Sequence, residues 1–81
     1  MLELYQKESC PYCTKVRGVL DELQLDYIVH SMPNGSPKRV FLKTLGGKEQ
    51  VPFLVDQVHG VSMYESDDII EYLKNTYVAK N

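Results

Sequence analysis

The sequence predicts an α/β fold with one four-stranded mixed sheet, helices on both faces and the element order β-α-β-α-β-β-α. Two observations lead to this prediction: strand patterns alternate with helical patterns, and the third and fourth strands are joined by a connection too short for a crossover. The length of the chain is a further observation, because 81 residues suit a single domain covering 1–81. A sheet covered on both faces is the compact solution for such an order.

The first half of the chain predicts a strand, a helix and a second strand. Leu2–Gln6 alternates apolar and polar residues, and Asp26–His30 is dense in strand formers. Between them, apolar residues recur at helical spacing from Pro11 to about Leu23, with Lys15, Arg17, Asp21 and Glu22 expected on the solvent side. The two strands should therefore be parallel, with a right-handed crossover.

A second helix should begin after a turn-rich loop and end at a glycine pair. Ser36 is expected to cap it and Pro37 to be its first residue, and Gly46-Gly47 should end it. Its inward side is expected to consist of Val40, Phe41 and Leu45.

The last third predicts a hairpin and a final helix. Val51–Val55 and Val61–Tyr64 are the expected strands, antiparallel across a short turn. Ser66 is expected to cap the last helix, with Asp67 and Asp68 in its first turn, where negative charge is favourable. Its inward side should be Ile69, Ile70, Leu73 and Tyr77, and Val78–Asn81 should be a frayed tail.

Cys10-Pro11-Tyr12-Cys13 is the motif that carries chemistry. It contains both cysteines of the chain and lies between a predicted strand and a predicted helix. Free N–H groups and the dipole at a helix start favour a thiolate, which is the attacking form of cysteine. We therefore predict Cys10 as the nucleophile and Cys13, one turn further on, as the resolving thiol. Lys7 could add positive charge nearby.

Other interpretations of the pair are a buried apolar contact or part of a metal site. Two thiols cannot complete a four-ligand zinc site, and His30 and His59 are distant and show no ligand spacing. We therefore predict no metal site and no tightly bound cofactor.

Composition and charge limit the partners and the cellular compartment that the sequence predicts. The net charge of −2 argues against a nucleic-acid partner, and no apolar run approaches membrane-spanning length. The first residues do not have the pattern of a secretory signal. A close cysteine pair in a reducing compartment is more often catalytic than structural, so we expect a cytoplasmic protein. We also expect it to be a monomer.

These residues resemble a known family, the glutaredoxins, over essentially the whole length. The resemblance rests on Cys10-Pro11-Tyr12-Cys13, on Val51-Pro52, and on the Ser66-Asp67-Asp68 helix start. It implies the thioredoxin/glutaredoxin fold. The stretch from Tyr64 to Leu73 is also similar to the N-terminal domain of glutathione transferases, which share that fold.

The resemblance implies a glutathione site. The Val51–Pro52 bond would be cis, and the Val51 backbone would pair with the cysteinyl part of glutathione. The Ser66 N–H and the Asp67 side chain would hold the γ-glutamyl end at the helix start. Lys7 would face the glycyl carboxylate and Tyr12 would pack beside the sulfur.

Two positions depart from the glutaredoxin pattern. Gln50 replaces a threonine, and Tyr64-Glu65 replaces a glycine pair, which could narrow the groove or repel an anionic ligand. Glu65-Ser66 instead follows the glutathione-transferase pattern.

The function that follows is a glutathione-linked thiol–disulfide oxidoreductase. Its partners would be glutathione and proteins that carry disulfides or glutathionylated cysteines, in electron transport and cell redox homeostasis. Two alternatives remain open. One is a glutaredoxin-like redoxin reduced by a flavoprotein reductase. The other is an iron–sulfur-bridging binding module that uses glutathione as a co-ligand.

Overall fold

The computed structural model describes residues 1–77 and contains the predicted order of four strands and three helices. The strands are β1 (Leu2–Gln6), β2 (Tyr27–Ser31), β3 (Phe53–Asp56) and β4 (Val61–Tyr64). The helices are α1 (Pro11–Glu22), α2 (Lys38–Gly46) and α3 (Ser66–Thr76). The tail predicted over Val78–Asn81 lies outside the described residues.

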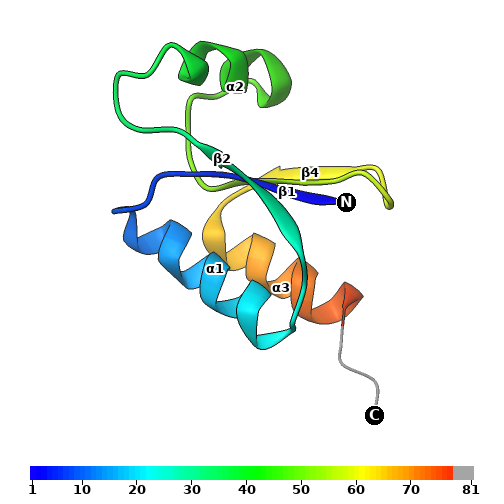
Figure 1. Ribbon diagram of the computed structural model, residues 1–81. Coiled ribbons are helices and arrows are strands. Elements are labelled where there is room, and N and C mark those ends of the chain that lie inside the picture. Colours follow the sequence, from blue (N-terminus) through cyan, green and yellow to red (C-terminus); the bar gives the residue numbers. More distant parts are fainter. Residues whose placement is uncertain (78–81) are drawn as a thin grey trace.

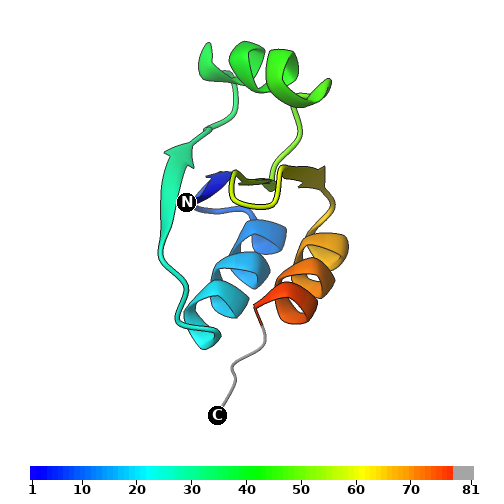
Figure 2. The ribbon, with the colours of Figure 1, turned by 90° about the vertical axis from the view of Figure 1, so that its right-hand side faces the viewer.

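The sheet is mixed, as predicted. Its strand order is β2-β1-β3-β4, with β1 parallel to β2, antiparallel to β3, and β3 antiparallel to β4. Helices α1 and α3 lie side by side on one face, and α2 lies on the other (Figures 1 and 2). The predicted fold class is therefore confirmed.

Two apolar clusters hold the layers together, one on each face of the sheet. The larger one joins the sheet to α1 and α3 and consists of Leu2, Leu4, Val16, Val19, Leu20, Leu54, Ile69 and Leu73. The smaller one lies on the α2 side and consists of Tyr5, Met32, Leu42 and Phe53. Neighbouring strand residues enter different clusters because successive side chains point to opposite faces.

The predicted inward side of α2 is wrong. Val40, Phe41 and Leu45 are 63%, 55% and 45% exposed, and Leu42 is the buried residue of this helix. The short helix contacts the sheet through Leu42, which packs with Tyr5, Met32 and Phe53. The other apolar side chains are thereby left in solvent.

Several predicted boundaries shift by one or two residues, as helix and strand ends commonly do. The second strand is Tyr27–Ser31, and the third begins at Phe53, after Val51-Pro52. Helix α2 begins at Lys38, although Ser36 Oγ accepts a hydrogen bond from the Lys38 N–H at 3.2 Å.

The start of α3 differs from the prediction in one further respect. Glu65, with φ of 72°, precedes the helix, and Ser66 is its first residue. Glu65 therefore occupies the capping position, and the prediction that Ser66 caps this helix is wrong. As the first helical residue, Ser66 has a backbone N–H without an intrahelical partner.

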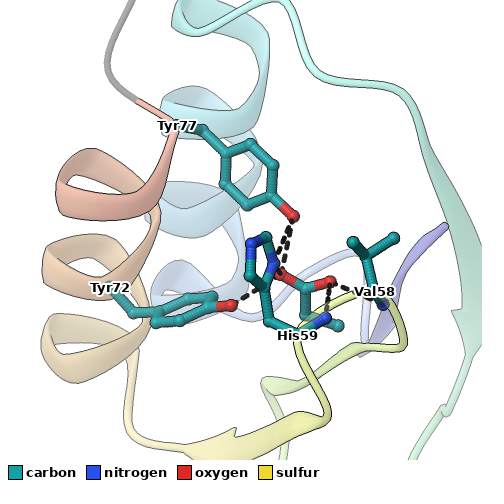
Figure 3. A network of polar contacts seen from close by, with 5 residues as sticks. Val58, His59, Tyr72 and Tyr77 are labelled. Atoms are coloured by element: carbon teal, nitrogen blue, oxygen red, sulfur yellow. Dashed lines mark hydrogen bonds and ion pairs between the residues drawn. The ribbon is translucent and has the colours of Figure 1, made fainter.

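A buried carboxylate joins the β3–β4 hairpin to α3. Asp56 is fully buried and accepts hydrogen bonds from the hydroxyls of Tyr72 and Tyr77, both at 2.6 Å, and from His59 Nδ1 at 2.8 Å (Figure 3). It also accepts the backbone N–H groups of Val58 and His59. This network ties one end of the sheet to the last turns of α3.

Candidate active site

Cys10 lies where the sequence predicted it, at the start of α1. It is the residue before the helix, in an extended conformation, and Pro11 is the first helical residue. Its N–H donates to the Lys7 carbonyl at 3.1 Å, which closes the loop that follows β1. Thr14 Oγ1 donates to the Cys10 carbonyl at 3.0 Å. The loop and the first turn of the helix therefore hold the backbone of Cys10 from both sides.

The surroundings of Cys10 favour its thiolate. Cys10 is buried, which raises the pKa of its thiol, but several groups outweigh this effect. The N–H and thiol of Cys13, the N–H of Tyr12 and the charge of Lys7 all act to lower the pKa, and the net shift is downward. The donors at a helix start therefore act on this sulfur as the sequence predicts.

Cys13 has the opposite character. It is fully buried, and burial raises the pKa of its thiol to about 11. The Cys10 sulfur raises it further, while the backbone N–H of Lys7 and the charge of Arg17 lower it. Both cysteines are free thiols. The pair thus combines one thiol that ionises readily with a neighbour that keeps its proton.

A cavity of about 390 Å³ reaches the motif at Tyr12, although neither cysteine is among its lining residues, and it has a size suited to a small ligand. It is lined by Tyr12, Gln50, Val51, Pro52, Glu65, Ser66 and Asp67. The structure therefore brings together five predicted site residues from three separate parts of the chain. The Val51–Pro52 peptide bond is cis, as the resemblance implied.

Lys7 is not part of that cavity. It lines a second one of about 450 Å³, between the loop before Cys10 and the loop after β2, together with Glu8, Ser9, Ser31, Pro33 and Asn34. Its charge acts on the Cys10 sulfur across the loop. The predicted contact of Lys7 with a glycyl carboxylate stays a prediction.

The two positions that replace the glycine pair behave differently from each other. Tyr64 packs against Phe53 in a tilted arrangement with ring centroids 4.4 Å apart, and its hydroxyl donates to the Lys48 carbonyl at 2.8 Å. Glu65 lines the cavity, and Gln50 Nε2 donates to its carboxylate at 2.6 Å. Sequence reasoning named Gln50 and Glu65 only as departures from a pattern and missed their contact across the mouth of the cavity.

Asp67 carries a negative charge at the cavity rim. Its Oδ1 lies 3.0 Å from Lys15 Nζ of α1, and both side chains are exposed. A ligand ammonium group that approaches Asp67 would therefore meet a carboxylate that already has a surface partner.

Within residues 1–77, no cluster of three histidine, cysteine or acidic side chains could hold a metal ion. In the same part of the chain, no helix is long and apolar enough to cross a membrane.

Comparison with known sequences reveals two related groups. A family model described as "Glutathione S-transferase, N-terminal domain" matches residues 4–81. Glutaredoxin 1 of Rickettsia felis is 37% identical over 59 residues, covering 69% of this chain and 58% of the relative. Glutaredoxin 1 of Rickettsia prowazekii is 36% identical over 59 residues, covering 69% and 62%. The chain thus spans about 58% of the length of the first of these relatives.

Solved structures share the fold. A delta-class glutathione transferase from Nilaparvata lugens superposes with a TM-score of 0.88 at 22% identity, covering 99% of this chain and 38% of that one. Ure2p in complex with glutathione gives a TM-score of 0.83 at 26% identity, covering 94% and 33%. The resemblance to glutaredoxins and glutathione transferases is therefore confirmed, and the fold is thioredoxin-like. By its match over residues 4–81, the chain belongs to the family of glutathione S-transferase N-terminal domains.

Proposed function

We propose that this domain is a glutathione-linked thiol–disulfide oxidoreductase with Cys10 as nucleophile and Cys13 as resolving thiol. The observation that carries the proposal is the asymmetry of the pair at the start of α1. The pKa of Cys10 is lowered there, whereas burial raises the pKa of Cys13 to about 11. A thiolate is the attacking species in exchange, so this asymmetry supports Cys10 as the first to react.

In the proposed reaction, the Cys10 thiolate attacks one sulfur of a substrate disulfide. A Cys10–substrate disulfide forms and the other substrate sulfur leaves as a thiolate, which takes up a proton. For a protein disulfide, Cys13 then attacks Cys10, releasing the second substrate thiol and leaving a Cys10–Cys13 disulfide. Two glutathione molecules reduce that disulfide and become glutathione disulfide.

For a glutathionylated protein, the first attack transfers glutathione to Cys10 and releases the protein thiol. A second glutathione then resolves the mixed disulfide without Cys13. Several observations support glutathione as the co-substrate: the cavity that Tyr12 lines, the start of α3 at Ser66, and relatives named glutaredoxin. A solved relative in complex with glutathione adds to them.

The setting we propose is a reducing compartment such as the cytoplasm, with the domain acting as a monomer on protein partners. The close free thiols are suited to such a compartment. No tightly bound cofactor takes part in the proposed reaction.

A glutathione-coupled disulfide reductase assay tests the proposal with two variants. Cys10→Ser should lose reduction of both protein disulfides and glutathione mixed disulfides. Cys13→Ser should lose only the first, because the second needs one thiol. Activity that persists in Cys10→Ser would refute the assignment of the nucleophile. Circular dichroism of both variants controls for folding.

A second candidate is a redoxin with the same cysteine chemistry that is reduced by a flavoprotein. The position of Glu65 in the cavity favours it, because a carboxylate there would repel the carboxylates of glutathione. Titration with glutathione, followed by chemical shifts, separates the two candidates. Perturbation around Val51 and Ser66 supports the glutathione-linked enzyme, and unchanged shifts support the redoxin.

A further inference from the structure

Arg17 joins three parts of the chain around the cysteine pair. Its Nη1 donates to the side-chain oxygen of Gln6, a buried residue at the end of β1. Its Nη2 donates to Thr14 Oγ1 at 3.0 Å and to the Glu8 carbonyl at 3.3 Å. The Arg17 side chain is 21% exposed and its Nη2 lies 3.6 Å from the carboxylate of the exposed Glu8, so this residue keeps partial contact with solvent but is more buried than its predicted place on the solvent side of α1 implies.

These contacts lie on both sides of Lys7. Gln6 precedes it and Glu8 follows it, and both are bonded to the same guanidinium. The backbone N–H of Lys7 acts to lower the pKa of the Cys13 thiol. Arg17 therefore fixes the loop segment that presents this N–H to Cys13.

Arg17 also acts on Cys13 through its charge. The two residues are four apart on α1, and residues at that spacing are neighbours on one helix face. Burial is the largest influence on the Cys13 pKa and raises it, while the Arg17 charge acts in the opposite direction. Two influences thus favour the anion of the resolving thiol: the charge of Arg17 itself, and the N–H of Lys7, whose two sequence neighbours are bonded to Arg17.

We propose that Arg17 is a positioning residue for the resolving step, holding the Lys7 N–H and its own positive charge beside the Cys13 sulfur so that this buried thiol can ionise and attack. This inference rests on the proposed function. In the step, Cys13 gives its proton to water and its thiolate attacks Cys10 of the mixed disulfide. The Cys10–substrate bond breaks, the Cys10–Cys13 bond forms, and the substrate sulfur leaves with the electron pair and is protonated.

The inference predicts an effect confined to one route. Loss of Arg17 should slow reduction of protein disulfides, which needs Cys13, and should spare reduction of glutathione mixed disulfides, which does not. A role restricted to stability would lower both routes together, in proportion to the folded fraction.

The test compares Arg17→Met and Arg17→Lys with a matched control. Lys74→Met removes one positive charge from an exposed position of α3. Arg17→Met should slow protein-disulfide reduction by roughly three- to tenfold, the size expected when one nearby charge and one hydrogen bond to a thiolate are lost. Arg17→Lys should recover part of that loss because it retains the charge. Lys74→Met should match the unmodified protein in both routes.

A direct measurement of Cys13 ionisation completes the test. In a Cys10→Ser background, the ¹³C chemical shift of the Cys13 Cβ reports the ionisation of this thiol as the pH is raised, separately from the six tyrosines of the chain. Adding Arg17→Met should move the midpoint to higher pH, whereas adding Lys74→Met should not. An unmoved midpoint, or equal loss of both routes at full folding by circular dichroism, would overturn the inference.

The outcomes also separate this inference from the proposed function. If the unmodified protein reduces neither substrate class, the proposed function fails, and the titration still decides whether Arg17 favours the Cys13 anion. If the unmodified protein reduces both classes and Arg17→Met behaves like Lys74→Met, the function stands and the role of Arg17 is refuted.

Discussion

Asp56→Asn is the substitution that should affect the stability of this domain most directly. Asp56 is fully buried and accepts bonds from Tyr72, Tyr77 and His59. An asparagine keeps the shape but loses the charge and replaces one acceptor oxygen with a donor. The amide nitrogen would then face hydroxyl groups that now donate to a carboxylate.

The expected loss follows from these bonds. A hydrogen bond to a charged group contributes about 1.5–3 kcal/mol, and a neutral one about 1 kcal/mol. Weakening the two tyrosine bonds and the histidine bond should therefore cost about 3 kcal/mol of the free energy of unfolding. For a domain of this size, 1 kcal/mol corresponds to about 4–8 °C in Tm, so the Tm should fall by about 12–24 °C.

The loss should depend on pH. Burial acts to raise the pKa of Asp56, but the hydrogen bonds from Tyr72, Tyr77 and His59 outweigh it and hold the pKa well below its usual range. A lowered pKa contributes stability that is present above about pH 4 and is lost as the pH falls toward the folded-state pKa. The unfolding curves of the unmodified protein and the variant should therefore converge in acid.

Urea unfolding followed by circular dichroism, from neutral pH into acid, measures both effects. Asp26→Asn, at an exposed position in the loop before β2, is the matched control. Asp56 is the last residue of β3, whereas Val51 and Pro52, which belong to the candidate site, precede the first residue of that strand. The substitution therefore lies at the far end of the strand from the site, and the reactivity of Cys10 per folded molecule should not change. A difference below about 0.5 kcal/mol between the two variants would refute the reasoning, since that is the usual size of a neutral surface change.

Three further predictions concern other parts of the molecule. Gly46→Ala should destabilise by about 1–3 kcal/mol in urea unfolding, because its Cβ would collide with Tyr64, whereas Gly18→Ala, in open space, should stabilise slightly. Asp67→Asn should weaken glutathione binding roughly tenfold by calorimetry, while its exposed ion pair predicts a stability change under about 1 kcal/mol. Alkylation of Cys10 should rise with a midpoint below the ~8.5 of a free cysteine; a midpoint at or above that value would contradict the lowered pKa.

The sequence predicted the layers well because its strongest patterns are long. The stripe of α1, with Val16, Val19 and Leu20, lies in a helix of 12 residues, and all three residues are buried. Helix α2 has only nine residues, and four of them have large apolar side chains: Val40, Phe41, Leu42 and Leu45. A pattern over two turns does not determine which side of the helix faces the sheet. Leu42 is the buried residue because it packs against Phe53 and Met32, and these residues lie outside the helix whose pattern was used.

The cysteine pair was predictable because its chemistry follows from local context, a strand before it and a helix after it. The contacts of Arg17 were not, because they depend on the path of the loop between β1 and α1. Arg17 lies four residues after Cys13, and this spacing could have indicated that the two side chains are neighbours on the helix. The apolar pattern of the helix alone predicted that Arg17 faces solvent. The bond between Gln50 and Glu65 depends in the same way on how two distant loops meet.

The strand order has a consequence for how the chain folds during synthesis. β1 is made first, yet it lies inside the sheet, between β2 and β3. The β1-α1-β2 unit leaves the ribosome early and has one bare edge until β3 follows, and such edges invite pairing with other chains. We therefore expect a nascent fragment ending near Ser31 to associate with copies of itself, whereas a chain extended through β4 should close that edge internally.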